Sequence, residues 1–330
     1  MRRLFALLVA ALGLVAIGKE AAAQDKYPSK PVKIIVPYAP GGATDIVSRI
    51  IGEQLRQDLG QTFITENKPG AFGIIAIEEM ARAKPDGYTL MIGNVSTNAI
   101  TPILFPKKFS IKYDRDVIPV ARLVDVPAFV VVTTKDFPVK TLPELVAYAK
   151  EHKGKVRYGS VGVGSYPHYD TEVFARRAGN LDMIAIHNKA GASGVLKDMA
   201  TGDIQFCFLN VASAGPLIKG GQIRPIALVN PTRLPEYPDV PTMAELGYAN
   251  VGTLAWQALF APAGTPKEVL DTLNKAILQA MEAPQVKDTF AKQYFNIVPS
   301  KSAEEAKTWL ADEIAHWRKI TEEVKIDLAE

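Results

Sequence analysis

The chain has 330 residues, a formal net charge of +3 and a single cysteine. This length exceeds the usual size of one domain, so two lobes are expected. The small net charge argues against a general nucleic-acid-binding protein, which would be far more basic. Cys207 has no partner in the chain for a disulfide, and its apolar neighbours predict a buried core thiol.

The first 23 residues have the layout of a secretory signal peptide. Arg2 and Arg3 precede an apolar run from Leu4 to Ile17, and alanines follow at 21–23 before Gln24. We therefore predict that the chain is exported and that its mature part has 35 basic and 34 acidic residues. No later stretch approaches the roughly 20 apolar residues of a membrane-spanning helix, so a soluble mature protein is expected.

Strand-like runs alternate with amphipathic helical segments along the mature chain. The expected strands are 32–36, 62–65, 89–92, 129–133, 156–158, 183–186, 204–208 and 223–228. Such alternation predicts an α/β protein with parallel sheets. Ser/Thr-x-x-Glu spacing predicts helix starts at Thr141, Thr242, Thr265 and Ser302, and the last of these opens a long helix with one buried face.

One arrangement of strand, glycine-rich loop and helix occurs twice. Strand 32–36 leads through two prolines and two glycines into a helix over 44–59, and strand 156–158 leads through loop 159–165 into a helix over 168–178. In open α/β sheets, ligands bind beyond the carboxyl ends of strands, where such loops gather. If the two halves form two lobes, the two loops face each other across a cleft.

These loops predict an anion site that needs no basic side chain. Glycines let main-chain N–H groups approach a ligand, and a helix start adds partial positive charge. Four or five hydrogen bonds to a carboxylate, each worth roughly 1.5–3 kcal/mol, suffice for micromolar binding. The expected donors are Gly42, Ala43, Thr44, Ser160 and Ser165. Alternatively, the first loop is only a tight connection in which Thr44 or Asp45 caps the helix.

A secreted hydrolase is the competing interpretation of the second loop. It would use Ser160 or Ser165 with His168, but Ser165 and His168 lie on one turn and no GxSxG elbow is present. His168 is better explained as a ligand-facing or capping donor, or as a structural histidine. The histidines show no metal-ligand spacing, and the loop has no nucleotide-binding pattern, so neither a metal nor a cofactor is expected.

An ordered set of motifs is similar to the periplasmic receptors of tripartite tricarboxylate transporters, the Bug-type solute-binding proteins. These motifs span nearly the whole mature chain and include PGGATD at 40–45, ENKPGAFG at 66–73, KPDGYTL at 84–90, PDVPT at 238–242 and APAGTP at 261–266. The resemblance implies a two-lobed type II periplasmic binding protein fold with a ligand cleft between the lobes. It also implies a periplasmic, monomeric receptor that closes over a small carboxylate and delivers it to membrane permease subunits.

The resemblance further implies lobe boundaries and site residues. Lobe I would comprise 24–124 and 233–330, and lobe II would comprise 125–232. No catalytic residue is implied. The predicted ligand-binding residues are Tyr38, Gly41, Gly42, Ala43, Thr44, Asp45, Ala71, Phe72, Gly73, Ser96, Ser160, Gly164, Ser165, His168, Asn188, Lys189 and Asp198.

Two departures from the family pattern concern the ligand. Residues 187–190 read His-Asn-Lys-Ala where a Pro-Tyr-Lys-Gly turn is common, and Lys189 either pairs with a second carboxylate or is a solvated surface lysine. Phe72 stands where glycine is frequent, which favours an aromatic or apolar ligand body. The possible aromatic neighbours are Tyr38, Tyr166, Tyr169 and Trp256, unless these rings pack the core.

One hypothesis about the ligand and two alternative functions remain. The paired glycine loops favour a ligand with two acidic groups, one served by each lobe. The alternative functions are the secreted hydrolase and a sensory component that binds a carboxylate and signals to a membrane kinase.

Overall fold

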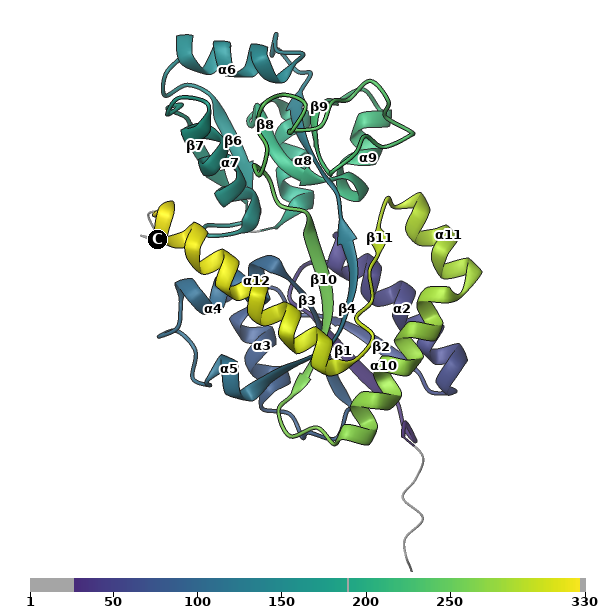
Figure 1. Cartoon of the computed structure of the whole chain (residues 1–330). Helices are drawn as coiled ribbons and strands as arrows, with labels where there is room; N and C mark the ends of the chain where they lie inside the picture. Colours follow the sequence, from purple (N-terminus) through teal and green to yellow (C-terminus); the bar gives the residue numbers. More distant parts are fainter. Residues whose placement is uncertain (1–26, 189, 327–330) are drawn as a thin grey trace, which may run out of the picture.

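The computed structural model describes residues 27–188 and 190–326, so the predicted signal peptide and Lys189 lie outside the described residues. Figure 1 shows two groups of elements joined by long strands, each group built on its own sheet. None of the helices in the described part of the chain has the length and apolar character needed to span a bilayer.

The first sheet has six strands in the order β11-β4-β10-β3-β1-β2. Its strands are β1 (Val32–Val36), β2 (Phe63–Asn67), β3 (Thr89–Asn94), β4 (Val117–Val126), β10 (Ala255–Pro262) and β11 (Asn296–Ile297). Its longer helices are α2 (Ala43–Leu59), α3 (Ile74–Ala81), α10 (Lys267–Glu282), α11 (Pro284–Lys292) and α12 (Ala303–Glu323). Short helical turns complete this half: η1 (Ala71–Gly73), η2 (Ser96–Ile100), α4 (Thr101–Leu104) and α5 (Tyr113–Asp116). In Figure 1, α2, α10 and α11 gather on one side of this sheet and α3, α4 and α5 on the other.

The second sheet has five strands in the order β7-β6-β8-β5-β9. They are β5 (Ala128–Thr133), β6 (Arg157–Ser160), β7 (Ile184–His187), β8 (Phe206–Asn210) and β9 (Ile223–Val229). Its helices are α6 (Leu142–Glu151), α7 (Tyr166–Arg177), α8 (Ala192–Thr201) and α9 (Val211–Lys219).

The eight expected strands are all present, and their ends differ from the prediction by at most two residues. The prediction of parallel sheets holds for β1 with β2 and β3 and for β6 with β7 and β8, but both sheets are mixed. Strand β10 runs antiparallel to β3 and β4, and β5 runs antiparallel to β8 and β9. The reason is that β5 and β10 begin where the chain crosses between sheets, so their direction is set by the crossing and not by a helix that returns the chain.

Two of the four predicted helix starts are confirmed. Thr141 and Ser302 each accept a hydrogen bond from the main-chain N–H three residues further on. Thr242 makes the same bond, but only a turn follows it. Thr265 is not a cap, because its hydroxyl donates to the main-chain oxygen of Pro262 and α10 begins two residues later.

The chain crosses between the sheets twice. The first crossing is at Pro127, between β4 and β5. After β9, residues 234–251 remain on the second sheet, where the main chain of Leu228 bonds to Pro241 and Met243. Apolar side chains of this segment also join the second sheet's core. We therefore propose that the second crossing lies at 252–254 and not near 233, because the segment covers apolar surface of the second sheet.

Helix α7 belongs to the second sheet but is tied to the first. Tyr166 and Tyr169 are buried in the core of the first sheet, and the Tyr169 ring packs edge-on against Trp317 of α12 with centroids 5.8 Å apart. Asp170, one turn after Tyr166 in α7, accepts hydrogen bonds from the main-chain N–H and the hydroxyl of Thr253, at 3.0 and 2.6 Å. Burial raises the pKa of Asp170 to about 7, against the opposing effect of these bonds.

Replacing Asp170 with asparagine tests the contact between Asp170 and Thr253. A raised pKa means that the folded state binds the proton more tightly than the unfolded chain. The contribution of Asp170 is therefore fully present below about pH 4 and is lost as the pH rises through 7. Denaturant unfolding from pH 4 to 8 is expected to show wild-type stability falling relative to Asp170→Asn as the pH rises. The low pKa values of His168 and His187 act in the opposite direction but cancel in this difference. A difference that is independent of pH would contradict the assignment.

Candidate ligand-binding site

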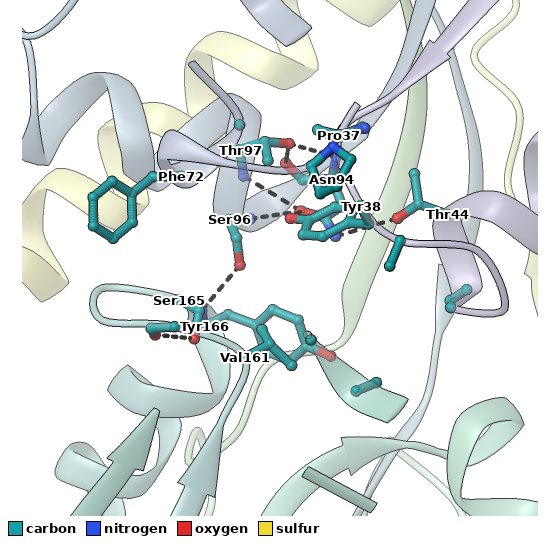
Figure 2. A pocket seen from close by; sticks show the side chains of 18 of the residues that line it. Pro37, Tyr38, Thr44, Phe72, Asn94, Ser96, Thr97, Val161, Ser165 and Tyr166 are labelled. Carbon is teal, nitrogen blue, oxygen red and sulfur yellow. Dashed lines mark hydrogen bonds between the residues drawn. The ribbon is translucent and has the colours of Figure 1, made fainter. Parts of the chain in front are cut away.

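A cavity of about 360 Å³ lies between the two sheets. From the first sheet it is lined by the loops that follow β1, β2 and β3. From the second sheet it is lined by residues 161–166, 190–193 and Asn210, and the crossing strands contribute Val126, Ala255 and Gln257. Figure 2 shows the two sides of this cavity facing each other. Both glycine-rich loops therefore open onto one cavity.

The start of α2 forms part of the cavity wall. Gly42 is the residue before the helix, with an extended backbone and no side-chain capping bond. The first N–H groups of a helix have no partner within it, so those of Ala43 and Thr44 are available to a ligand. These groups and the helix dipole favour a negatively charged ligand at this point.

Asp45 fastens this loop and does not line the cavity. Its carboxylate accepts hydrogen bonds from the Gly41 N–H at 3.0 Å, from Arg49 and from Asn67. The side chain is only 5% exposed. Burial alone would raise the pKa of Asp45, but the hydrogen bonds it accepts outweigh burial and hold the pKa below its usual value. The Asp45 charge is thereby paired away from the ligand, and the Gly41 N–H is already used.

A hydrogen-bond network backs the polar end of the cavity. Tyr38 donates to Asn94 at 2.8 Å, and Thr44 donates to Oε1 of Gln257 at 2.8 Å. Burial raises the pKa of Tyr38 to about 12, so its hydroxyl stays a neutral donor. The network orients Gln257 with its amide nitrogen uncommitted to any described residue.

The loop after β2 is built from four consecutive residues with positive φ. Gly70, Ala71, Phe72 and Gly73 have φ of 125°, 45°, 57° and 86°. Gly73 is required for space as well, since a Cβ there would lie 2.5 Å from the Cγ2 atom of Thr97. The loop's shape therefore depends on left-handed backbone that favours glycine.

The second glycine loop is held by its own side chains. Ser165 donates to the main-chain oxygen of Gly162 at 2.7 Å, and Nδ1 of His168 accepts the Gly164 N–H at 3.1 Å. Burial and the neighbouring His187 lower the pKa of His168 to about 3, so the ring is neutral. The side chains of Ser165 and His168 share no hydrogen bond among those described, so the Ser165–His168 pair of the hydrolase hypothesis is not formed.

One hydrogen bond joins the two sides of the cavity directly. The main-chain N–H of Tyr166, at the start of α7, donates to the hydroxyl of Ser96 at 3.1 Å, as the dashed line in Figure 2 shows. Ser96 follows β3 in the first sheet. The two lobes are therefore in contact at the cavity wall.

The structure divides the predicted site residues into two groups. Those that line the cavity are Tyr38, Gly42, Ala43, Thr44, Ala71, Phe72, Gly73, Ser96, Gly164 and Ser165. Those outside the lining are Gly41, Asp45, Ser160, His168, Asn188 and Asp198. Lys189 lies outside the described residues.

Several residues of the second group support the lining from behind. Ser160 bonds to His187 at 2.7 Å, and Asn188 donates to Asp198 at 2.7 Å while accepting the Ala190 N–H. The last two bonds hold the segment that leads into α8.

The aromatic prediction is partly wrong. Tyr166 lines the cavity, as does Tyr38, but Tyr169 and Trp256 are core residues. The indole N–H of Trp256 donates to Glu313 on α12, away from the cavity.

Sequence reasoning missed six polar residues of the lining, which are Asn94, Thr97, Thr101, Ser193, Asn210 and Gln257. Asn94 and Asn210 are the last residues of β3 and β8, so a search for polar residues at the ends of the predicted strands would have found them. Gln257 lies in β10, a strand that was not predicted. No simple sequence signal marks it.

The described lining has no ionisable side chain other than tyrosine. Among the described residues, no group of histidine, cysteine, aspartate or glutamate side chains could hold a metal ion. The site therefore offers main-chain and amide N–H groups, with no acidic side chain to repel an anion.

Comparisons with known proteins identify the class of protein and then its family. A solved structure of a periplasmic transporter matches with a TM-score of 0.85 at 35% identity, covering 92% of this chain and all of the other. The structure of the periplasmic binding protein BugD matches with a TM-score of 0.82 at 27% identity, over 90% of this chain and 98% of BugD. These matches confirm the predicted α/β periplasmic binding protein fold.

The sequence profile described as "Tripartite tricarboxylate transporter family receptor" matches residues 47–326, so the chain belongs to that family. BugT of Bordetella pertussis is 31% identical over 98% of both chains. The family and the fold are those of solute-binding receptors. Rpa4515 of R. palustris, solved with adipate, matches with a TM-score of 0.84 at 29% identity over 90% of this chain and 97% of Rpa4515. MatC of Rhodopseudomonas palustris, solved with malate, matches with a TM-score of 0.81 at 29% identity over 89% of this chain and 99% of MatC.

Two glycine substitutions test how the cavity is built. Gly73→Ala is expected to destabilise the fold by about 2 kcal/mol or more, because the new methyl group meets Thr97 and positive φ disfavours it. Gly42→Ala is expected to cost about 1 kcal/mol or less, since only the preference for glycine before the helix is lost and no atom lies within 4 Å of its Cβ position. Thermal unfolding measures both variants. Equal destabilisation of the two would contradict this description of the loops.

Proposed function

We propose that this protein is an exported periplasmic receptor that captures a small carboxylate between its lobes and delivers it to the membrane permease of a tripartite transporter. The observation that carries the proposal is the cavity between the two sheets, which begins at the free N–H groups of α2 and has no acidic side chain in its described lining. Family membership supports the same role.

The available donors are sufficient for useful affinity. The first lobe offers the N–H groups of Ala43 and Thr44 and the amide nitrogen of Gln257. The second lobe offers the start of α8, where Gly191 precedes the helix without a side-chain cap and Ala192 lines the cavity. Micromolar binding needs about 8 kcal/mol, and each hydrogen bond to a carboxylate contributes roughly 1.5–3 kcal/mol before the entropic cost of association.

The placement of these donors favours a ligand with two acidic groups. The starts of α2 and α8 come from different lobes and both reach the same cavity. A dicarboxylate joins them only when the lobes are closed, so binding shifts the protein towards the closed form. The permease would then recognise that closed form. The adipate and malate complexes of related proteins make these two acids the first ligands to test.

Calorimetry and thermal shift with adipate, malate and the uncharged analogue adipamide test the proposal. At least one of the two acids is expected to bind, and at 100 times its dissociation constant it stabilises the fold by about 2.7 kcal/mol. Adipamide is expected not to bind, because it lacks the charge that the helix starts favour. Pairs of mono- and dicarboxylates with the same carbon chain test whether the ligand needs a second acidic group. Equal affinity for the two members of each pair would contradict the preference for a dicarboxylate. Binding of adipamide as tightly as adipate would contradict the anion site itself.

A further inference from the structure

The loop that carries Phe72 holds an aromatic residue in a backbone conformation that normally belongs to glycine. Ala71 and Phe72 have φ of 45° and 57°, and both neighbours of this pair are glycines with positive φ. Left-handed backbone is unfavourable for residues with a Cβ, and such strain concentrates at functional sites. The chain therefore places a phenylalanine here at a cost in stability.

Neighbouring groups fix the position of the Phe72 ring. It stacks on the ring of Phe105, with centroids 4.5 Å apart and planes 20° apart. The Lys108 ammonium lies 5.2 Å from the Phe72 centroid and 4.8 Å from that of Phe105. The hydroxyl of Thr101 donates to the main-chain oxygen of Phe72 at 3.0 Å. Because both backbone and ring are held, the cavity has a rigid aromatic wall.

The aromatic wall and the polar donors lie at different places in the cavity. Figure 2 shows Phe72 well separated from Thr44 and Tyr38, with Ser96 between them. Pro69, Ala71 and Phe72 give the loop after β2 an apolar lining. A ligand whose carboxylate meets α2 can therefore direct its carbon chain towards Phe72.

We propose that Phe72 determines specificity by contacting the carbon chain of the bound acid. It selects ligands with an aliphatic or aromatic body over compact, hydroxylated acids of the same charge. Phe72 forms no part of the anion site, so its contribution depends on the ligand body and not on the carboxylate. The inference rests on the proposed carboxylate-binding function.

Calorimetry with adipate and malate on the wild type, Phe72→Gly and Phe72→Leu tests the inference. Both ligands have two carboxylates, but adipate has a longer apolar chain and malate has a hydroxyl group. The wild type is expected to prefer adipate. Phe72→Gly is expected to weaken adipate binding about tenfold and to change malate binding less than about twofold, because an aromatic contact acts on the apolar chain. Phe72→Leu keeps an apolar side chain, so its affinity for adipate is expected to lie between those of the wild type and Phe72→Gly.

Stability separates a binding role from a structural one. Thermal unfolding of Phe72→Gly is expected close to the wild-type temperature, because the relief of positive φ by glycine offsets the loss of the stack on Phe105. Phe109→Leu is the matched control, since Phe109 packs against Tyr113 and lies outside the described cavity lining. This control is expected to leave the preference for adipate unchanged.

Three outcomes would overturn the inference while leaving the proposed function intact. They are a wild type that prefers malate, a Phe72→Gly variant that loses both acids equally, and one that keeps the full preference for adipate. Failure of the wild type to bind any carboxylate would instead overturn the proposed function, and the inference with it.

Discussion

The site depends on main-chain N–H groups that the start of α2 cannot satisfy within the helix. The start of α2 lies at the carboxyl end of β1, the central strand of the parallel part of the first sheet. The loops that follow β2 and β3 begin at the same edge of that sheet. Asp45 secures the loop by accepting the Gly41 N–H and by pairing with Arg49. Its charge is thereby used inside the protein, and no acidic side chain of the described lining opposes the partial positive charge of the α2 start.

The second lobe forms the opposite wall of the cavity. Its glycine loop is stiffened by Ser165 and His168 and lies opposite α2, while α7 extends from that loop onto the first lobe. The Ser96–Tyr166 hydrogen bond and the Asp170–Thr253 pair mark where the lobes meet. Any opening of the cleft at its wall has to break the Ser96 bond. In the proposed function, closing the lobes on a ligand therefore includes forming the Ser96–Tyr166 hydrogen bond.

Local sequence patterns could predict eight of the strands, the glycine loops and the convergence of both loops on one cavity. Glycines, apolar runs and capping residues act over a few residues, so they are readable without the fold. The antiparallel placement of β10 and the site residue Gln257 depend on pairing between distant segments, which no local pattern records. Ser160 and His168 were predicted to contact the ligand, but the structure places them behind the loop. Both side chains contact His187, Ser160 through a hydrogen bond of 2.7 Å and His168 through a ring contact with centroids 4.5 Å apart.

The most direct test of the α2 site removes one N–H group without disturbing the helix. Ala43 is the first residue of α2, and Gly42 before it has φ of −83° and ψ of 168°, which suits a following proline. Ala303→Pro, at the first position of α12, is the matched control away from the cavity. Calorimetry with the tightest-binding carboxylate is expected to show that Ala43→Pro weakens binding about 10- to 100-fold at unchanged stability, while Ala303→Pro binds as the wild type does. Wild-type affinity in a folded Ala43→Pro variant would contradict the account.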